Sequence, residues 1–196
     1  MIIIYLKKLN MKQLNNFINE KLKISSKSKI NQYNYFPKNK NELISILFKR
    51  KINLQDNNDY KLDCSDIDVS EIEDLSELFR EEDYKEINIS GWNLNKCKTL
   101  KSMFYGCRYL ERVIGFDSLD ISNVEDLSFI FSRCKNLINI GDLSNWDVKD
   151  KNLAYAFQMC SKLKSIGDLS KWDLKNPTWS TFEVCGINIS SLHKKP

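Results

Sequence analysis

The sequence contains no run of eighteen apolar residues, so no segment of it is expected to span a bilayer. It has a single histidine, His193, which is predicted to be a solvated tail residue rather than a catalyst. A glycine-rich phosphate loop, a Gly-x-Ser-x-Gly elbow and a His-Glu-x-x-His zinc motif are all missing. These absences predict a protein that is not an enzyme and that binds no cofactor.

Charge is distributed unevenly over the 196 residues. Residues 1–40 contain nine lysines and one glutamate, a net charge of +8, so the rest of the chain carries −4 of the overall +4. A mass of 23.0 kDa with 42% apolar residues suits one domain with an appendage. The composition therefore predicts a basic arm, residues 1–32, joined to a mildly acidic body.

The first residues do not resemble a secretory signal. The apolar run Met1–Leu6 is too short, and Lys7 and Lys8 follow it instead of preceding it. We therefore expect a cytoplasmic or virion-associated protein rather than a cell-surface one, with its cysteines reduced. Met11 is a second plausible start of translation.

The arm carries apolar residues at helical spacing, with lysines on the other face. These apolar residues are Leu14, Phe17, Ile18 and Leu22. A solvated amphipathic arm is the favoured interpretation, and binding to nucleic acid or to a membrane surface is the alternative. Met11–Glu20 also resembles the short targeting peptides of capsid-internal proteins of tailed phages, which implies cleavage after Glu20.

Residues 33–61 are predicted to form a helical cap for the body. Pro37 holds its neighbour extended, and Asn39 or Asn41 can then cap a helix that ends at Lys49–Lys51. Its predicted core-facing residues are Leu43, Ile44, Leu47 and Phe48. The Asn- and Asp-rich stretch 55–60 is predicted to be a turn.

The body, residues 62–190, is an internal repeat followed by a tail, 191–196. Five phenylalanines are separated by 25, 27, 26 and 25 residues: Phe79, Phe104, Phe131, Phe157 and Phe182. A second series keeps step with them, each member being a large apolar residue followed by Asp or Asn: Ile67-Asp68, Trp92-Asn93, Leu119-Asp120, Trp146-Asp147 and Trp172-Asp173. Two markers in register indicate five units of one repeat.

Each unit divides into two halves. After the apolar-Asp pair, apolar residues at i, i+3, i+6 and i+7 predict a short helix, and Ser70 with Glu73 and Ser122 with Glu125 have the spacing of a capping box. The other half, with apolar residues three apart and bends at Gly141 and Gly167, predicts a short strand. The fold class is therefore an α/β solenoid of short parallel strands and short helices.

These motifs resemble the BspA-type leucine-rich-repeat proteins, which have repeats of about 25 residues and occur in bacterial surface proteins and in some phages. The resemblance rests on the Trp-Asp-Val and Leu-Asp-Ile-Ser-Asn-Val patterns and on Met-Phe-Tyr-Gly-Cys at 103–107, and it covers about residues 62–190. It implies a leucine-rich-repeat-like fold and a binding or adhesive role.

The residues that could carry chemistry fit structural roles. The repeat cysteines Cys107, Cys134, Cys160 and Cys185 each follow a repeat phenylalanine by three residues and are predicted to be small core residues. The sequence has no Cys-x-x-Cys pair, so no metal site is predicted. Trp92, Trp146 and Trp172 alternate with aliphatic residues in one slot, which favours packing over a ligand platform. The repeated aspartates are predicted to hold turns.

The sequence therefore predicts a non-enzymatic module that binds a protein partner through a continuous repeat face. Exposed positions beside the strands, Glu111, Arg112, Asn139 and Ser165, are the expected partner-facing residues. The alternative is a virion- or nucleic-acid-associated protein that acts through its basic arm, with salt-sensitive binding. An enzyme would need polar groups that converge in one pocket, which a repeat does not provide.

Overall fold

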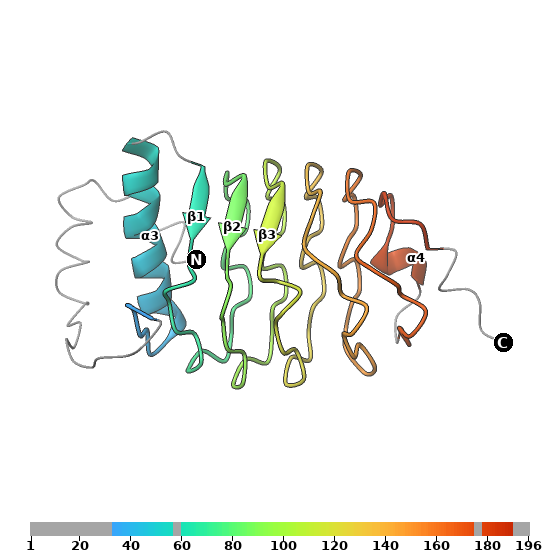
Figure 1. Ribbon diagram of the computed structural model, residues 1–196, viewed down its shortest axis with the longest axis horizontal. Helices are drawn as coiled ribbons and strands as arrows, with labels where there is room; N and C mark the ends of the chain where they lie inside the picture. The colour runs from blue at the N-terminus through green and yellow to red at the C-terminus, as the bar shows by residue number, and fades with distance from the viewer. Residues whose placement is uncertain (1–32, 57–59, 175–177, 190–196) are drawn as a thin grey trace.

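The structure is a computed structural model that describes residues 33–56, 60–174 and 178–189. It is mixed α/β, with the element order α3 (Lys40–Asp56), β1 (Lys61–Asp63), β2 (Glu86–Asn88), β3 (Arg112–Ile114) and α4 (Thr178–Thr181). Helix α3 lies at one end beside β1, and the units that follow lie side by side along the longest axis toward α4 (Figure 1).

The three strands form one parallel sheet in the order β1-β2-β3. The central residues Leu62, Ile87 and Val113 pair in register and are buried, while their neighbours along each strand point outward. Each three-residue strand therefore inserts one apolar side chain into the core, between two more exposed neighbours. In the fourth unit the ladder continues as a single bridge between Arg112 and Asn139.

The predicted helix in the other half of each unit is wrong for the units between α3 and α4. There the backbone N–H groups of Leu75, Glu77 and Phe79 donate to carbonyls of the next unit, at 3.1, 2.9 and 2.9 Å. The same pattern recurs one unit later, and tight turns lie between these bonds. These hydrogen bonds run between units rather than within a helix. Apolar residues that recur every three positions therefore indicate successive turns in this half of the unit.

Two rows of left-handed residues make these turns. Glu77, Ser102, Phe129 and Tyr155 have φ between 55° and 57°. The second row has φ between 54° and 71° and comprises Glu81, Gly106, Arg133, Met159 and Val184. The left-handed conformation costs about 1–2 kcal/mol for a non-glycine residue, and the hydrogen bonds between units offset that cost.

The predicted capping boxes are replaced by turns that aspartate side chains hold. The N–H of Ser70 donates to Asp68 Oδ1 and that of Ser122 to Asp120 Oδ1, both at 2.9 Å. Asn93 and Asp147 accept equivalent bonds at 2.9 and 3.0 Å. A second row does the same, with Asp74, Thr99, Asp126 and Asn152 as acceptors. The prediction that the repeated aspartates hold turns is confirmed at Asp68, Asp120 and Asp147.

The core contains a row of phenylalanines, Phe79, Phe104, Phe131, Phe157 and Phe182, called here the Phe row. Each member is at most 5% exposed. Adjacent rings stack with centroids 5.3, 5.0, 5.9 and 5.4 Å apart and interplanar angles of 4–17°. Stacked aromatic rings bury large apolar areas, so this row joins all five units through one core.

Helix α3 begins as predicted and ends later than predicted. The N–H of Glu42 donates to Asn39 Oδ1 at 3.1 Å, and Asn39 Nδ2 donates back to Glu42 Oε1 at 3.0 Å. The helix continues to Asp56 through part of the stretch predicted as a turn. Leu43, Ile46 and Leu47 are its buried residues in the core. Among the described residues, no helix is long and apolar enough to cross a membrane.

Candidate interaction surface

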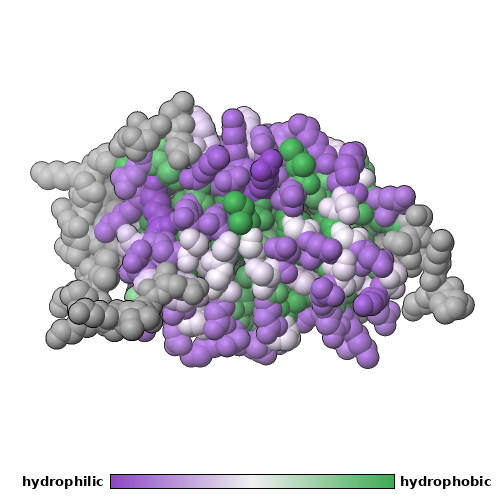
Figure 2. All heavy atoms as spheres, in the orientation of Figure 1, coloured by the Kyte–Doolittle hydropathy of each residue, from purple (hydrophilic) through white to green (hydrophobic). Residues whose placement is uncertain are grey.

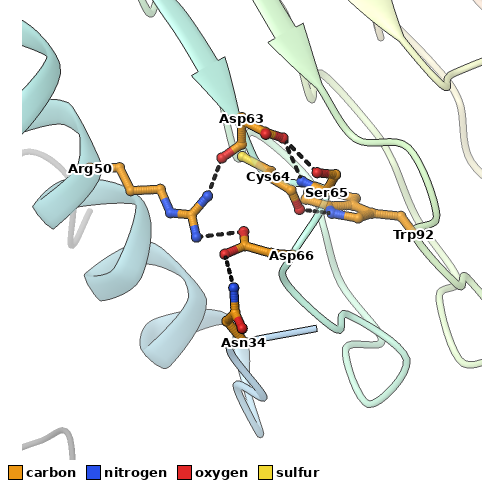
Figure 3. Close-up of polar contacts among 7 residues, drawn as sticks. All are labelled: Asn34, Arg50, Asp63, Cys64, Ser65, Asp66 and Trp92. Atoms are coloured by element: carbon orange, nitrogen blue, oxygen red, sulfur yellow. Dashed lines mark hydrogen bonds and ion pairs between the residues drawn. The ribbon is translucent and has the colours of Figure 1, made fainter. Parts of the chain in front are cut away.

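Arg50 of α3 joins the helix to the first unit (Figure 3). Its guanidinium donates to the Asp63 carbonyl and, at 2.6 Å, to the Asp66 carboxylate, which also accepts from Asn34 Nδ2 at 3.0 Å. Arg50 also lies over the Tyr35 ring, 4.9 Å from its centroid. These polar groups already have partners, so they hold the helix in place rather than a ligand.

Asp63 shows how such contacts affect a carboxylate. Partial burial acts to raise its pKa, but bonds from the Ser65 N–H and hydroxyl, at 2.9 and 2.7 Å, and the nearby Arg50 charge act in the opposite direction. The pKa of Asp63 is lowered overall. Asp63 is therefore a charged turn residue and not a general acid.

The expected partner-facing residues Glu111, Arg112, Asn139 and Ser165 are all exposed. Arg112 and Asn139 are bridge partners, and the Glu111 carbonyl accepts the N–H of Asn139 at 3.2 Å. The side chains of Asn139 and Ser165 accept the N–H groups of Gly141 and Gly167, at 2.7 and 3.2 Å. The structure therefore brings Glu111, Arg112 and Asn139 together at neighbouring positions, and it uses the Asn139 and Ser165 side chains to hold bends.

Exposed apolar residues beside this group were missed by sequence reasoning. Tyr109 is 56% exposed, Ile138 49% and Ile114 43%. Their position next to Glu111, Arg112 and Asn139 in the sequence was the available signal. Figure 2 shows one face of the molecule, on which hydrophobic residues are visible between hydrophilic ones that gather along the two long edges.

The repeat cysteines lie in a row beside the Phe row. The Sγ atoms of Cys107 and Cys134 donate to the carbonyls of Phe79 and Phe104, both at 2.9 Å. Cys160 repeats the pattern with Phe131 at 3.1 Å, whereas Cys185 is only half-buried. All are free thiols.

Burial raises the pKa of Cys134, Cys160 and Cys185, and it raises the pKa of Cys97 to about 11. Such thiols stay protonated near neutral pH and are poor nucleophiles. Within the described ranges, no group of three His, Cys, Asp or Glu residues is placed to hold a metal ion.

The repeat tryptophans are buried, with 5–9% exposure. Trp92 Nε1 donates to the Cys64 carbonyl at 2.9 Å, and Trp172 Nε1 donates to the Leu143 carbonyl at 3.2 Å. The Trp146 ring is tilted against the Phe116 ring with centroids 5.0 Å apart, but its buried Nε1 has no partner among the described residues. None of these three rings presents a face on which a sugar or base could stack.

A known protein family matches most of the chain. The family described as "Mycoplasma protein of unknown function, DUF285" matches residues 19–116 and 113–182. The chain belongs to the DUF285 family. This repeat family of unknown function is related to BspA-like repeat proteins in general. No curated protein and no solved structure matches the chain.

The two DUF285 matches overlap at residues 113–116, which include the end of β3. The first match begins at residue 19, inside the segment that the composition predicts as a basic arm. That arm, residues 1–32, the cleavage expected after Glu20, and the tail with His193 lie outside the described residues.

Proposed function

We propose that this DUF285 chain is a leucine-rich-repeat-like solenoid of the BspA type that binds a protein partner and catalyses no reaction. Its units repeat in register in three respects: the Phe row, the turns held by Asp, Asn or Thr, and the backbone bonds between units. In a solenoid each unit packs only against its neighbours, which leaves long continuous faces for a partner.

The observation that carries this proposal is that Asp and Cys side chains of the repeat, which could be reactive, are engaged in hydrogen bonds within the structure. Asp68, Asp120 and Asp147 hold turns through their Oδ1 atoms. The thiols of Cys107 and Cys134 donate to core carbonyls. Within the part of the chain that the structure describes, the exposed residues beside the strands are spread along the units rather than gathered into a reactive group.

Site-specific photo-crosslinking of the full chain tests this function. A photoreactive side chain replaces Arg112 or Ile138 beside the sheet, and Glu125 or Lys149 serves as the exposed control position away from it. In an extract of the source cells, we expect a discrete protein adduct from Arg112 and Ile138 and none from the controls. Equal labelling at all four positions would contradict the proposal.

The alternative function, through the basic arm, predicts a different result. A photoreactive side chain at Phe17 would then give nucleic-acid or virion-protein adducts that disappear as salt rises, while Arg112 and Ile138 give none. Residues 1–40 carry a net charge of +8, which is the sequence feature behind this alternative.

A further inference from the structure

Cations accumulate on one edge of the repeat, in the segment that leads into β3 and in the corresponding segments of the next two units. Segments 105–112, 132–139 and 158–165 together contain six Lys or Arg residues and one carboxylate, Glu111. The corresponding segment of the preceding unit, 79–86, contains two cations and four carboxylates. The edge therefore changes sign from acidic to basic along the row of units.

All six of these cations are exposed, and five of them are called here the basic edge: Arg108, Arg112, Lys135, Lys162 and Lys164. The sixth, Arg133, lies over the Tyr105 ring at 5.5 Å. Hydrogen bonds hold neighbouring loops side by side, since Asn136 Nδ2 donates to the Arg108 carbonyl at 2.7 Å and Ser161 Oγ to the Lys135 carbonyl at 3.4 Å.

Among the described residues, the carboxylates do not neutralise this edge. Every ion pair among the described residues uses a cation between Lys40 and Lys98, and none uses a cation of the basic edge. Glu86 is in register with both Lys61 and Arg112, and it pairs with Lys61 at 3.8 Å. Lys164 Nζ donates only to a neutral group, the Ser161 carbonyl, at 3.3 Å.

We infer that the basic edge binds a short acidic segment of the protein partner. This inference rests on the proposed function and specifies the chemistry of its partner. Neighbouring parallel strands are about 4.8 Å apart, so the edge spans about 10 Å over three units. An extended peptide covers that distance with about three residues at about 3.3 Å each.

The surroundings of the edge favour a peptide over nucleic acid. Ile138, 49% exposed, and Tyr109, 56% exposed, lie among the cations and offer apolar contacts to side chains. Tyr and Arg are enriched in protein interfaces. Single-stranded nucleic acid needs a longer basic track, of about four nucleotides or more.

Carbodiimide coupling to a labelled oligo-glutamate peptide tests the inference on the full chain. The carbodiimide activates a peptide carboxylate. A lysine Nζ then attacks the activated carboxyl carbon to form an amide, and the reagent leaves as a urea. We expect adducts at Lys135, Lys162 and Lys164 to exceed those at Lys149 and Lys171 at least fivefold. Raising salt from about 0.02 to about 0.2 M should reduce that excess, because these charges are exposed.

Arginine substitutions distinguish electrostatic attraction of the peptide from the chemical reactivity of the lysines. The double variant Arg108→Gln with Arg112→Gln leaves every lysine in place, and we expect it to lower the adducts at the three edge lysines several-fold. The matched control, Lys149→Gln with Lys171→Gln, removes the same charge from exposed positions outside the three edge segments, and it should leave the edge adducts unchanged. Circular dichroism melts verify that both variants are folded.

Three results would overturn the inference: even labelling of all exposed lysines, equal effects of the two double variants, or stronger competition by oligothymidylate than by unlabelled peptide. Failure here is separable from failure of the proposed function. If the photo-crosslinked protein binds both double variants equally, the acidic-segment inference is wrong and protein binding stands.

Discussion

The first half of the described body, residues 33–100, and the second half, residues 101–189, share one core and differ at the surface. The Phe row runs through both halves with similar ring spacing. Every cation in an ion pair among the described residues belongs to the first half, where Arg50, Lys51 and Lys40 connect α3 to the first unit. The second half keeps exposed cations beside apolar residues.

This difference separates two uses of charge. In the first half, carboxylates and cations hold the helical cap on the repeat. In the second half, Lys151 is buried and donates to the carbonyls of Ser122 and Val124. The five cations of the basic edge stay exposed there, although exposed charges contribute little to stability. The comparison indicates that packing and the bonds between units, rather than ion pairs of its cations, hold the second half together.

The largest expected effect tests the shared core. Phe104→Ala in the first unit of the second half and Phe79→Ala in the first half should each destabilise the protein by about 3–5 kcal/mol, because each removes a ring that is at most 1% exposed. Urea unfolding at low and high salt measures both. A cost that depends on salt, or that is confined to one half, would contradict a single continuous core.

A glycine pair gives the next largest effect. Gly115 has φ of 81°, and a Cβ there would lie 2.5 Å from Ser90 Cα in the preceding unit. Gly115→Ala should therefore cost about 2–4 kcal/mol through strain and overpacking. Gly106, at φ 71°, would meet only the flexible Glu81 Cγ at 3.0 Å, so Gly106→Ala should cost about 1 kcal/mol. Equal losses in thermal melts would show that close approach between units does not matter.

A charge comparison addresses the two halves directly. Arg50→Gln breaks the link between α3, Asp63 and Asp66 and should cost about 1.5–3 kcal/mol, the range for hydrogen bonds to charged groups. Arg112→Gln, on the exposed side of β3, should change the free energy of unfolding by less than about 0.5 kcal/mol. Denaturant unfolding measures both, and a larger loss from Arg112→Gln would reverse the assignment of roles.

Sequence reasoning predicted features that depend on local chemistry. The Phe row follows from spacing alone, and Asn39 caps α3 because a side-chain oxygen can reach a nearby N–H. The predicted short helices failed because apolar residues three apart suit a turn as well as a helix, and the bonds that decide between them come from the next unit. The partners of Arg50 were missed because Asp63 and Asp66 become its neighbours only when α3 packs on the sheet.

The basic edge was only partly predictable from the sequence. Its cations recur in segments 105–112, 132–139 and 158–165 and are visible in the sequence. The net charge of −4 outside residues 1–40 concealed them, because acidic residues of the first half outweigh them in the sum. The structure adds that three of those acidic residues, Glu77, Glu82 and Glu86, form ion pairs within the first half.

The smallest predicted effect concerns the tryptophan slot. Trp92→Phe, Trp146→Phe and Trp172→Phe remove the same volume, but Trp92 and Trp172 also lose a hydrogen bond to a buried carbonyl. Trp146 has a buried Nε1 without a partner among the described residues. Trp92→Phe should therefore cost about 1 kcal/mol more than Trp146→Phe in urea unfolding. If Trp172→Phe behaves like Trp92→Phe, the hydrogen bond decides the cost; if it behaves like Trp146→Phe, the half of the molecule decides, and the core is less uniform than its ring spacing indicates.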